Sequence, residues 1–291
     1  RDVAPSRGLG DVYKRQVGSS ELELQVFNDA LNQAAYRGPD HQHVSINNGI
    51  TWGFNRLSIM DLSSKGNQPF VYKDCVLVCN GEVYNYHSLK AMLETDYTFK
   101  SGSDCEVLIP LYHKYGIEIL CKFLDAEFAM VIYDAKKDKI LAARDPMGIR
   151  PMFYGYHKED GKICFASEAK GLFPLCQEIM PFPPGHYYED GKFICYNDLS
   201  NPKTINNDDL ETIATNLRLK LEKAVEKRLQ SDAPIGYLLS GGLDSSLVCA
   251  IAARLNDQPI KTFAIGMDTD PIDLKYAKPV SYTHLTLPTK A

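Results

Sequence analysis

Short apolar runs separated by turn residues dominate the chain between residues 44 and 200. CVLVCNGEVYN, FAMVIYD, KILAARD, KICFASE and KFICYND all predict β-strands, and AKKDK between the second and third predicts a hairpin loop. Two segments instead repeat apolar residues at helical spacing, namely residues 21–36 and SDCEVLIPLYHKYG, with Val107, Leu108, Leu111, Tyr112 and Tyr115. Antiparallel strands beside helices predict α+β layering for this half of the chain.

A polar segment at residues 200–208 indicates the start of a second domain. It leads into an amphipathic helix, for which Asp208 and Glu211 form a predicted capping box. The strand PIGYLLS, a glycine-rich turn, the helix SSLVCAIAARL and the strand IKTFAIGM follow, an order that predicts a parallel sheet with a ligand at its carboxyl edge. About 70 residues of this unit are present, too few to close a doubly wound domain, so we expect the chain to stop within it. The apolar face of the helix comprises Ile213, Leu217, Leu221, Ala224 and Val225.

Composition and charge argue against nucleic-acid binding, membrane association and a metal bound by cysteine. The net charge of −5 and the pI near 5.8 argue against nucleic-acid binding, which needs clustered Lys and Arg. The chain of 291 residues has no apolar run long enough to span a bilayer and no signal-peptide core, so we expect no membrane association and a cytoplasmic location. The eight cysteines are interpreted as reduced core thiols. Cys75 and Cys79 lack the second pair of ligands that zinc requires, so no metal is assigned to cysteine.

The sharpest local motif is LLSGGLDSS at residues 238–246. It leaves an apolar strand and enters a helix, so backbone N–H groups and the helix N-terminus converge where an anion would bind. It lacks the G-K-[S/T] of a Walker A loop and the G-x-G-x-x-G of a dinucleotide fold. The S-G-G-x-D-S pattern resembles the pyrophosphate loop of ATP pyrophosphatases, and the alternative is a serine and glycine helix cap that binds no ligand.

Four further motifs precede this loop: YRGPD (36–40), NRLSIMD (55–61), NGEVYN (80–85) and SGSDCE (101–106). Each alone has a simple structural explanation as a turn or a helix cap. In this order they resemble the glutaminase domain of class II, N-terminal-nucleophile amidotransferases. Together with SGGLDSS they resemble the glutamine-hydrolysing asparagine synthetase family, over roughly residues 17–279.

The resemblance implies a fold and a glutamine site. The fold is an α+β layered N-terminal-nucleophile amidotransferase domain of antiparallel sheets and helices, followed by the truncated start of an α/β parallel-sheet ATP-pyrophosphatase domain. The oxyanion donors would be the Asn80 side chain and the Gly81 N–H. Arg56 would bind the substrate α-carboxylate, and Glu82 and Asp104 would accept its ammonium group. Backbone contacts to the same ligand would come from Leu57, Ser58, Ile59 and Met60.

The resemblance also implies an ATP site and a reaction. ATP, aspartate and glutamine would give asparagine, glutamate, AMP and pyrophosphate, and the enzyme could be a homodimer. Asp244 would hold Mg²⁺ through the phosphate oxygens. Leu238 and Ile265 would contact the adenosine. The remaining ATP-binding residues would be Ser240, Gly241, Gly242, Leu243, Asp244, Ser245 and Ser246.

The chain departs from the family pattern at three places. Tyr36 stands where the family usually has histidine, and residues 1–36 contain no cysteine, although the family begins with a cysteine nucleophile whose α-amino group is the base. Residues 1–16 and 280–291 match no part of the pattern and resemble translated adapter sequence, so both are expected to be non-native. The predicted domains are therefore residues 17–200, without a first strand or nucleophile, and residues 201–279.

These departures lead us to expect glutamine-binding residues without glutaminase or synthetase activity in this chain. Two alternatives stay open on the sequence. One is a related amidotransferase with a different carboxylate acceptor, since the residues that select the acceptor would lie beyond Pro279. The other is an inactive paralogue that only binds glutamine or a partner. RDPMGIRPMFY is interpreted as scaffold, with Arg144 and Asp145 paired.

Overall fold

The computed structural model describes residues 8–14, 21–202, 204–266 and 275–280. The described residues fall into two compact units, a larger one before residue 204 and a smaller one from residue 204 onward. The division falls between residues 203 and 204, three residues after the predicted domain boundary. That boundary and the origin of the two ends stay predictions.

Two antiparallel sheets build the described part of the larger unit. Sheet A contains β1 (Gly8–Lys14), β2 (His41–Asn47), β3 (Ile50–Arg56), β8 (Phe153–His157), β9 (Ile163–Ala166) and β10 (Cys176–Pro181), in the order β10-β8-β9-β1-β3-β2. Sheet B contains β4 (Phe70–Tyr72), β5 (Cys75–Val83), β6 (Ala126–Asp134), β7 (Lys139–Arg144), β11 (His186–Glu189) and β12 (Lys192–Cys195), in the order β12-β11-β7-β6-β5-β4. The predicted AKKDK hairpin joins β6 to β7.

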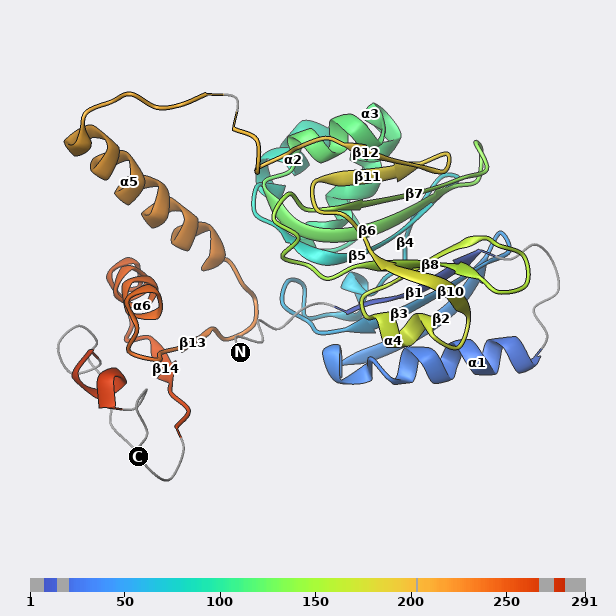
Figure 1. Ribbon diagram of the computed structural model, residues 1–291, viewed down its shortest axis with the longest axis horizontal. Coiled ribbons are helices and arrows are strands. Elements are labelled where there is room, and N and C mark those ends of the chain that lie inside the picture. Colours follow the sequence, from blue (N-terminus) through green and yellow to red (C-terminus); the bar gives the residue numbers. More distant parts are fainter. Residues whose placement is uncertain (1–7, 15–20, 203, 267–274, 281–291) are drawn as a thin grey trace. The chain divides into compact units, whose positions relative to one another are not determined.

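The sheets pack face to face, with helices on their outer faces (Figure 1). Side chains alternate between the faces of a strand, so Val76 and Val78 of β5 enter the core between the sheets. Leu77 and Cys79 enter the core shared with helices α2 (Tyr86–Leu93) and α3 (Leu108–Phe123). On the outer face of sheet A, Phe27 of α1 (Glu21–Asn32) and Leu172 of α4 (Ala169–Leu172) share a third core. This arrangement confirms the predicted α+β layering.

Strand β1 precedes residues 17–200, the range for which the absence of a first strand stays a prediction. It lies between β3 and β9 and pairs with both in antiparallel register. It also lies against β5 of sheet B. A strand at this position pairs the facing edges of β3 and β9, whose backbone polar groups would otherwise be unpaired.

Both predicted helices of this unit begin or end differently from the sequence pattern. The first stops at Asn32, and a short 3₁₀ turn, η1 (Ala35–Arg37), follows it. The second begins with another 3₁₀ turn, η3 (Asp104–Val107), in which Asp104 accepts from the Val83 N–H of β5 and Glu106 accepts from the Ser101 N–H. Gly116, with φ of 80°, kinks α3 near its middle, and Tyr115 just before it is partly exposed.

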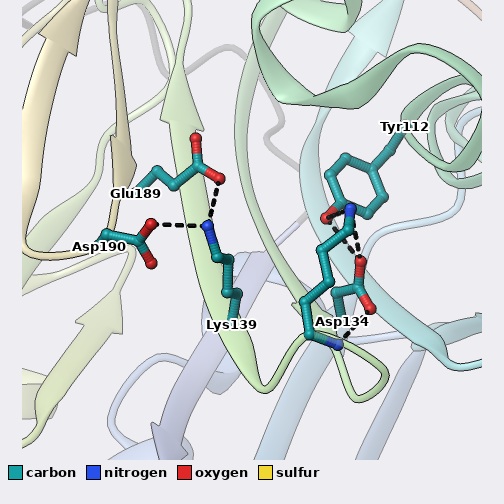
Figure 2. A network of polar contacts seen from close by, with 6 residues as sticks. Tyr112, Asp134, Lys139, Glu189 and Asp190 are labelled. Carbon is teal, nitrogen blue, oxygen red and sulfur yellow. Dashed lines mark hydrogen bonds and ion pairs between the residues drawn. The ribbon is translucent and has the colours of Figure 1, made fainter.

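A polar cluster around the buried Tyr112 and Asp134 fastens the β6–β7 hairpin to α3 (Figure 2). The Tyr112 hydroxyl donates to Asp134 (2.9 Å), and Lys137 lies 3.1 Å from the same carboxylate. Burial opposes ionisation of Asp134, but hydrogen bonds from Lys137 and Tyr112 hold its pKa below the usual value. Burial and the bond to Asp134 raise the pKa of Tyr112, so the phenol donates a proton to an ionised acceptor. Beside it, Lys139 binds Glu189 (3.2 Å) and Asp190 (2.6 Å).

Replacing Tyr112 by phenylalanine is expected to lower the free energy of unfolding by about 1.5 kcal/mol at neutral pH, the usual contribution of a hydrogen bond to a charged group. Because the folded-state pKa of Asp134 is depressed, the difference is present above the unfolded pKa and shrinks as the pH falls through the folded value. Urea unfolding at several pH values measures it. Tyr133→Phe is the control, since its hydroxyl binds the exposed Asp138, and an equal loss in both variants would contradict this account.

The smaller unit has the predicted β–α–β order. Helix α5 (Leu210–Arg228) precedes β13 (Gly236–Leu238), α6 (Leu243–Leu255) and β14 (Lys261–Phe263), and β13 and β14 pair in parallel. The α5 cap is Asp209, which accepts from the Thr212 N–H (2.9 Å), so the predicted capping box at Asp208 is wrong by one residue. Leu217 and Leu221 on the predicted apolar face are exposed, and only Val225 of α5 is buried in the described structure.

Two further features bear on the sequence predictions. Arg144 and Asp145 bind backbone groups instead of each other: Arg144 donates to the carbonyls of Arg150, Phe182 and Gly148, and Asp145 accepts from backbone N–H groups.

All eight cysteines carry free thiols, and all are buried except Cys195. No helix in the described ranges is long and apolar enough to cross a membrane.

Candidate functional site

The candidate glutamine site begins at the carboxyl end of β5. Strand alternation places Asn80 on the same face as Val76 and Val78, which point between the two sheets. The Asn80 side chain is 0% exposed, and neither its Nδ2 nor its Oδ1 has a hydrogen-bond partner among the described residues. A buried, unpaired amide costs about 1–3 kcal/mol per group, which indicates a side chain kept for a ligand.

Gly81 follows Asn80 on the open edge of sheet B. Strand β4 pairs with β5 only as far as Leu77, and side chains serve the edge beyond it. Gln68 accepts from the Cys79 N–H (2.6 Å), and Asp104 accepts from the Val83 N–H (2.7 Å). Because N–H groups alternate in direction along a strand, the Gly81 N–H points to this same edge. Asn80 and Gly81 are thus two consecutive residues whose donors face away from the partner strand β6.

Arg56 ends β3 and is 4% exposed. Its guanidinium donates from Nη1 to the Ser63 carbonyl (2.6 Å) and to Asn67 Oδ1 (2.7 Å), and from Nη2 to the carbonyls of Met60 and Asp61. The side chain therefore organises the loop that contains η2 (Ser64–Gly66), a function that the sequence did not indicate. Its predicted contact with a substrate carboxylate stays a prediction.

A cavity of about 430 Å³ opens beside Arg56 and Ser58. Both were predicted to contact glutamine. Leu57 and Ile59 are half-buried next to them, and Met60 is buried. The other residues that line the cavity are Asp40, His41, Leu62, Ser63, Ser64 and Asn67.

A hydrogen bond between Gly102 and Asp61 joins the loop beside this cavity to the segment that precedes Asp104. The Gly102 N–H donates to Asp61 Oδ2 (2.8 Å). Burial would raise the pKa of Asp61, but hydrogen bonds from Ser63 and Gly102 and the charge of Arg56 lower it overall. Two residues after Gly102, the Asp104 carboxylate is 1% exposed and binds β5. Asn80, Gly81, Glu82 and Asp104 lie outside the cavity lining in the described structure.

Two polar residues near this site were not identified from the sequence. Asp40 accepts from the Ser58 N–H (2.7 Å), and Gln68 binds both the N–H and the carbonyl of Cys79. The only signal in the sequence was their position, since Asp40 ends the quoted YRGPD motif and Gln68 follows NRLSIMD by seven residues.

The candidate phosphate loop lies between β13 and α6. Gly241 has φ of +81°, a backbone conformation that favours glycine, and a Cβ there would lie 2.5 Å from the Ala277 backbone nitrogen. The Ser240 and Ser245 hydroxyls lie 3.0 Å apart across the loop. The Ser246 hydroxyl is buried with no hydrogen-bond partner in the part of the chain described. The loop is therefore a tight strand-to-helix turn with an unpaired hydroxyl in the first turns of α6.

The remaining predicted ATP residues lie at the same edge of this unit. Leu238 ends β13, and Ile265 follows the end of β14 by two residues, so both lie at the carboxyl edge of the parallel pair. Both side chains are exposed, as is Leu243 at the start of α6. Gly242 caps α6, and Asp244 lies in its exposed first turn.

The described residues contain no group of three or more His, Cys, Asp or Glu side chains that could hold a metal ion. Among the described residues, Asp244 lies beside the loop in the first turn of α6 and belongs to no such group. Such an arrangement fits a Mg²⁺ ion carried by ATP phosphates, which takes one or two protein carboxylates, and does not fit an ion enclosed by protein ligands.

The chain belongs to the glutamine amidotransferase domain family, whose family model matches residues 12–186. Residues 216–289 match the asparagine synthase family model. The two matches follow the order of the two units.

Named relatives share this order. The chain is 38% identical over 279 residues to a probable glutamine-hydrolysing asparagine synthetase of Schizosaccharomyces pombe, covering 87% of this chain and 49% of that protein. It is 39% identical over 265 residues to asparagine synthetase B of Escherichia coli, covering 84% and 47%. The chain thus spans about half the length of these curated relatives.

Solved structures support the fold. Glutamine phosphoribosylpyrophosphate amidotransferase from B. subtilis, complexed with ADP and GMP, matches with a TM-score of 0.51 and 17% identity, over 89% of this chain and 66% of that one. At this identity the likeness concerns the fold alone. It agrees with the layered antiparallel sheets of the larger unit and with the predicted N-terminal-nucleophile amidotransferase fold.

Proposed function

We propose that the larger unit binds L-glutamine and the smaller unit binds ATP, as parts of a cytoplasmic asparagine synthetase. The proposed reaction converts ATP, aspartate and glutamine to asparagine, glutamate, AMP and pyrophosphate. The observation that carries the glutamine half is Asn80, a fully buried amide with both polar atoms unpaired among the described residues. The names of the relatives support the reaction.

In the proposed glutamine site, Asn80 Nδ2 and the Gly81 N–H donate to the side-chain carbonyl oxygen of glutamine. Both donors are fixed before the ligand arrives, so they would stabilise negative charge on that oxygen with little reorganisation. Arg56 supplies positive charge for the substrate α-carboxylate, and Asp104 and Glu82 supply negative charge for its ammonium group. Backbone groups of residues 57–60 would complete the binding site.

In the proposed ATP site, the loop of residues 240–242 and the N-terminus of α6 bind phosphate. The Ser246 hydroxyl provides a donor without a partner in the described structure, and the Gly241 backbone lets the loop turn tightly. Mg²⁺ would reduce the charge on the phosphates, and Asp244 is the residue that would hold it. The longer protein that contains this chain is proposed to act as a homodimer.

The reaction is tested on a longer protein that contains residues 17–279, a cysteine nucleophile and the rest of the synthetase domain. The proposal predicts asparagine and AMP in equal amounts, dependent on aspartate and on glutamine. Formation of ADP, or a faster reaction with another carboxylate acceptor, would contradict it. The present chain, with no cysteine in residues 1–36, is expected to release no ammonia from glutamine.

Gly66→Ala is expected to weaken L-glutamine binding by about tenfold, the effect of losing roughly 1.4 kcal/mol of interaction. A Cβ at Gly66 would collide with Arg56 Nη2 and lie 3.1 Å from the Asp61 carbonyl oxygen. Arg56 is held by four acceptors in this loop, so it must leave its position to make room. Calorimetric titration with L-glutamine measures the change.

Lys65→Ala is the matched control for Gly66→Ala, because Lys65 lies in the same turn and is exposed. It is expected to bind glutamine as the unchanged chain does. Equal affinity in Gly66→Ala and Lys65→Ala would show that the position of Arg56 does not matter for glutamine binding.

A further inference from the structure

Glu168 lies at the centre of a charged cluster that none of the predicted site residues enters. It lies two residues after the end of β9 and is the N-cap of α4. Its Oε1 accepts from the Tyr36 hydroxyl and from Arg37 Nη1 (3.2 Å), and its Oε2 lies 2.9 Å from Lys170 Nζ. The Lys170 ammonium also lies over the Tyr36 ring, 4.7 Å from its centroid. One carboxylate therefore binds two consecutive residues of η1.

The contact depends on one side chain of the YRGPD motif, because the Tyr36 hydroxyl is the group that reaches Glu168 Oε1. The Tyr36 side chain is otherwise 66% exposed, so no apolar packing explains its orientation. The Arg37 and Glu168 side chains are mostly buried, at 14% and 19% exposed, so solvent screens their attraction less than that of a surface pair.

Tyr36 and Arg37 begin a short segment, residues 36–40. Asp40 at its other end lines the cavity beside Arg56 and Ser58. A Cβ at Gly38 would collide with the Asn55 backbone, so the segment lies directly on β3. The Asp40 N–H donates to the Arg56 carbonyl (3.0 Å), and Asp40 Oδ2 accepts from the Ser58 N–H (2.7 Å). Asp40, Arg56 and Ser58 all line the cavity.

We propose that Glu168 is a positioning residue for glutamine binding: through Tyr36 and Arg37 it holds residues 36–40 against β3, and Asp40 in turn holds Arg56 and Ser58. This inference rests on the proposed glutamine site. Glu168 itself does not line the cavity. Only two residues separate Arg37, which binds Glu168, from Asp40, which binds Arg56 and Ser58. Loss of the Glu168 contact is therefore expected to loosen the contacts of Asp40.

The test compares Glu168→Ala with Glu189→Ala in the full chain. Glu189 is a suitable control because it also binds a lysine, Lys139, and belongs to β11, which β6 and β7 separate from β5 (Figure 2). Hydrogen exchange of the Asp40 and Ser58 amides and calorimetric titration with L-glutamine are measured in both variants. Glu168→Gln, whose amide oxygen can still accept from Tyr36 and Arg37, is the rescue variant.

Glu168→Ala is expected to speed exchange at Asp40 and Ser58 by about fivefold, as local opening becomes easier, and to weaken glutamine binding by about as much. Glu168→Gln should restore part of both effects, and Glu189→Ala should show neither. Unchanged exchange at these two amides would overturn the proposal. So would faster exchange throughout the sheets, which would indicate a general structural role.

Failure of the proposed function gives a different result. If the unchanged chain binds no L-glutamine, the glutamine site itself is wrong, and the role of Glu168 in glutamine binding is refuted with it. If the unchanged chain binds L-glutamine and Glu168→Ala binds it equally well, the site stands and only the positioning role is overturned.

Discussion

Replacing Asn80 by leucine is expected to raise the free energy of unfolding by about 1–3 kcal/mol while weakening L-glutamine binding at least tenfold. Leucine has nearly the shape of asparagine but no polar atoms, so it removes two buried groups that have no partners among the described residues. A gain in stability with a loss of binding is expected where a residue is kept for a ligand at the expense of the fold. Urea unfolding and calorimetric titration measure the two effects.

Asn55→Leu is the matched control for Asn80→Leu. Asn55 is 1% exposed, but its Nδ2 donates to the Leu31 carbonyl (3.0 Å) and its Oδ1 accepts from Gln42 (2.9 Å). Its replacement leaves the carbonyl of the buried Leu31 unpaired, so the free energy of unfolding should fall by about 1–3 kcal/mol. If both variants are destabilised alike, Asn80 is hydrogen-bonded in solution, and the argument for a preformed donor fails.

Gly81→Ala is expected to lower the free energy of unfolding by about 3 kcal/mol, near the upper end for an inserted methyl group. The new Cβ would lie 2.6 Å from the Glu127 carbonyl oxygen and 2.9 Å from Phe128 Cβ on the neighbouring strand β6. That strand cannot move away easily. Arg150 binds Glu127 (2.6 Å) in a buried ion pair, and Asp145 binds the backbone of Phe128.

Gly102→Ala is the control for Gly81→Ala, since its Cβ would approach no atom closer than 3.4 Å. It should change the free energy of unfolding by less than about 0.5 kcal/mol, as surface substitutions usually do. Urea unfolding of both variants decides the matter. A small effect of Gly81→Ala would mean that β5 and β6 can separate at the site, and the Gly81 N–H would then not be a fixed donor.

Local features of the fold were predictable from the sequence, and features that depend on distant partners were not. The AKKDK hairpin and the strand–loop–helix at SGGLDSS depend on neighbouring residues, and both form as predicted. Leu217 and Leu221 show the limit, because helical spacing identifies an apolar face but does not say what covers it. The position of β1 between β3 and β9 is a long-range pairing that the sequence pattern does not indicate.

In the candidate site, too, local features could be predicted from the sequence and contacts between distant residues could not. The motifs NGEVYN and SGSDCE lie close together in the structure, because the Asp104 carboxylate accepts from the Val83 N–H. Asn80 could be identified as a candidate donor, but its complete burial follows from the packing of two sheets. The loop contacts of Arg56 and the contact of Tyr36 with Glu168 join residues far apart in the chain. Side-chain chemistry was predictable, and these partners needed the tertiary structure.

The central claim is that Asn80 and the surrounding residues form a glutamine site, and calorimetric titration of the full chain with L-glutamine tests it most directly. The account predicts saturable binding of L-glutamine, little or no binding of D-glutamine, and at least about tenfold weaker binding of L-glutamine by Asn80→Leu. Absence of binding by the unchanged chain, or equal affinity in the folded Asn80→Leu variant, would contradict it.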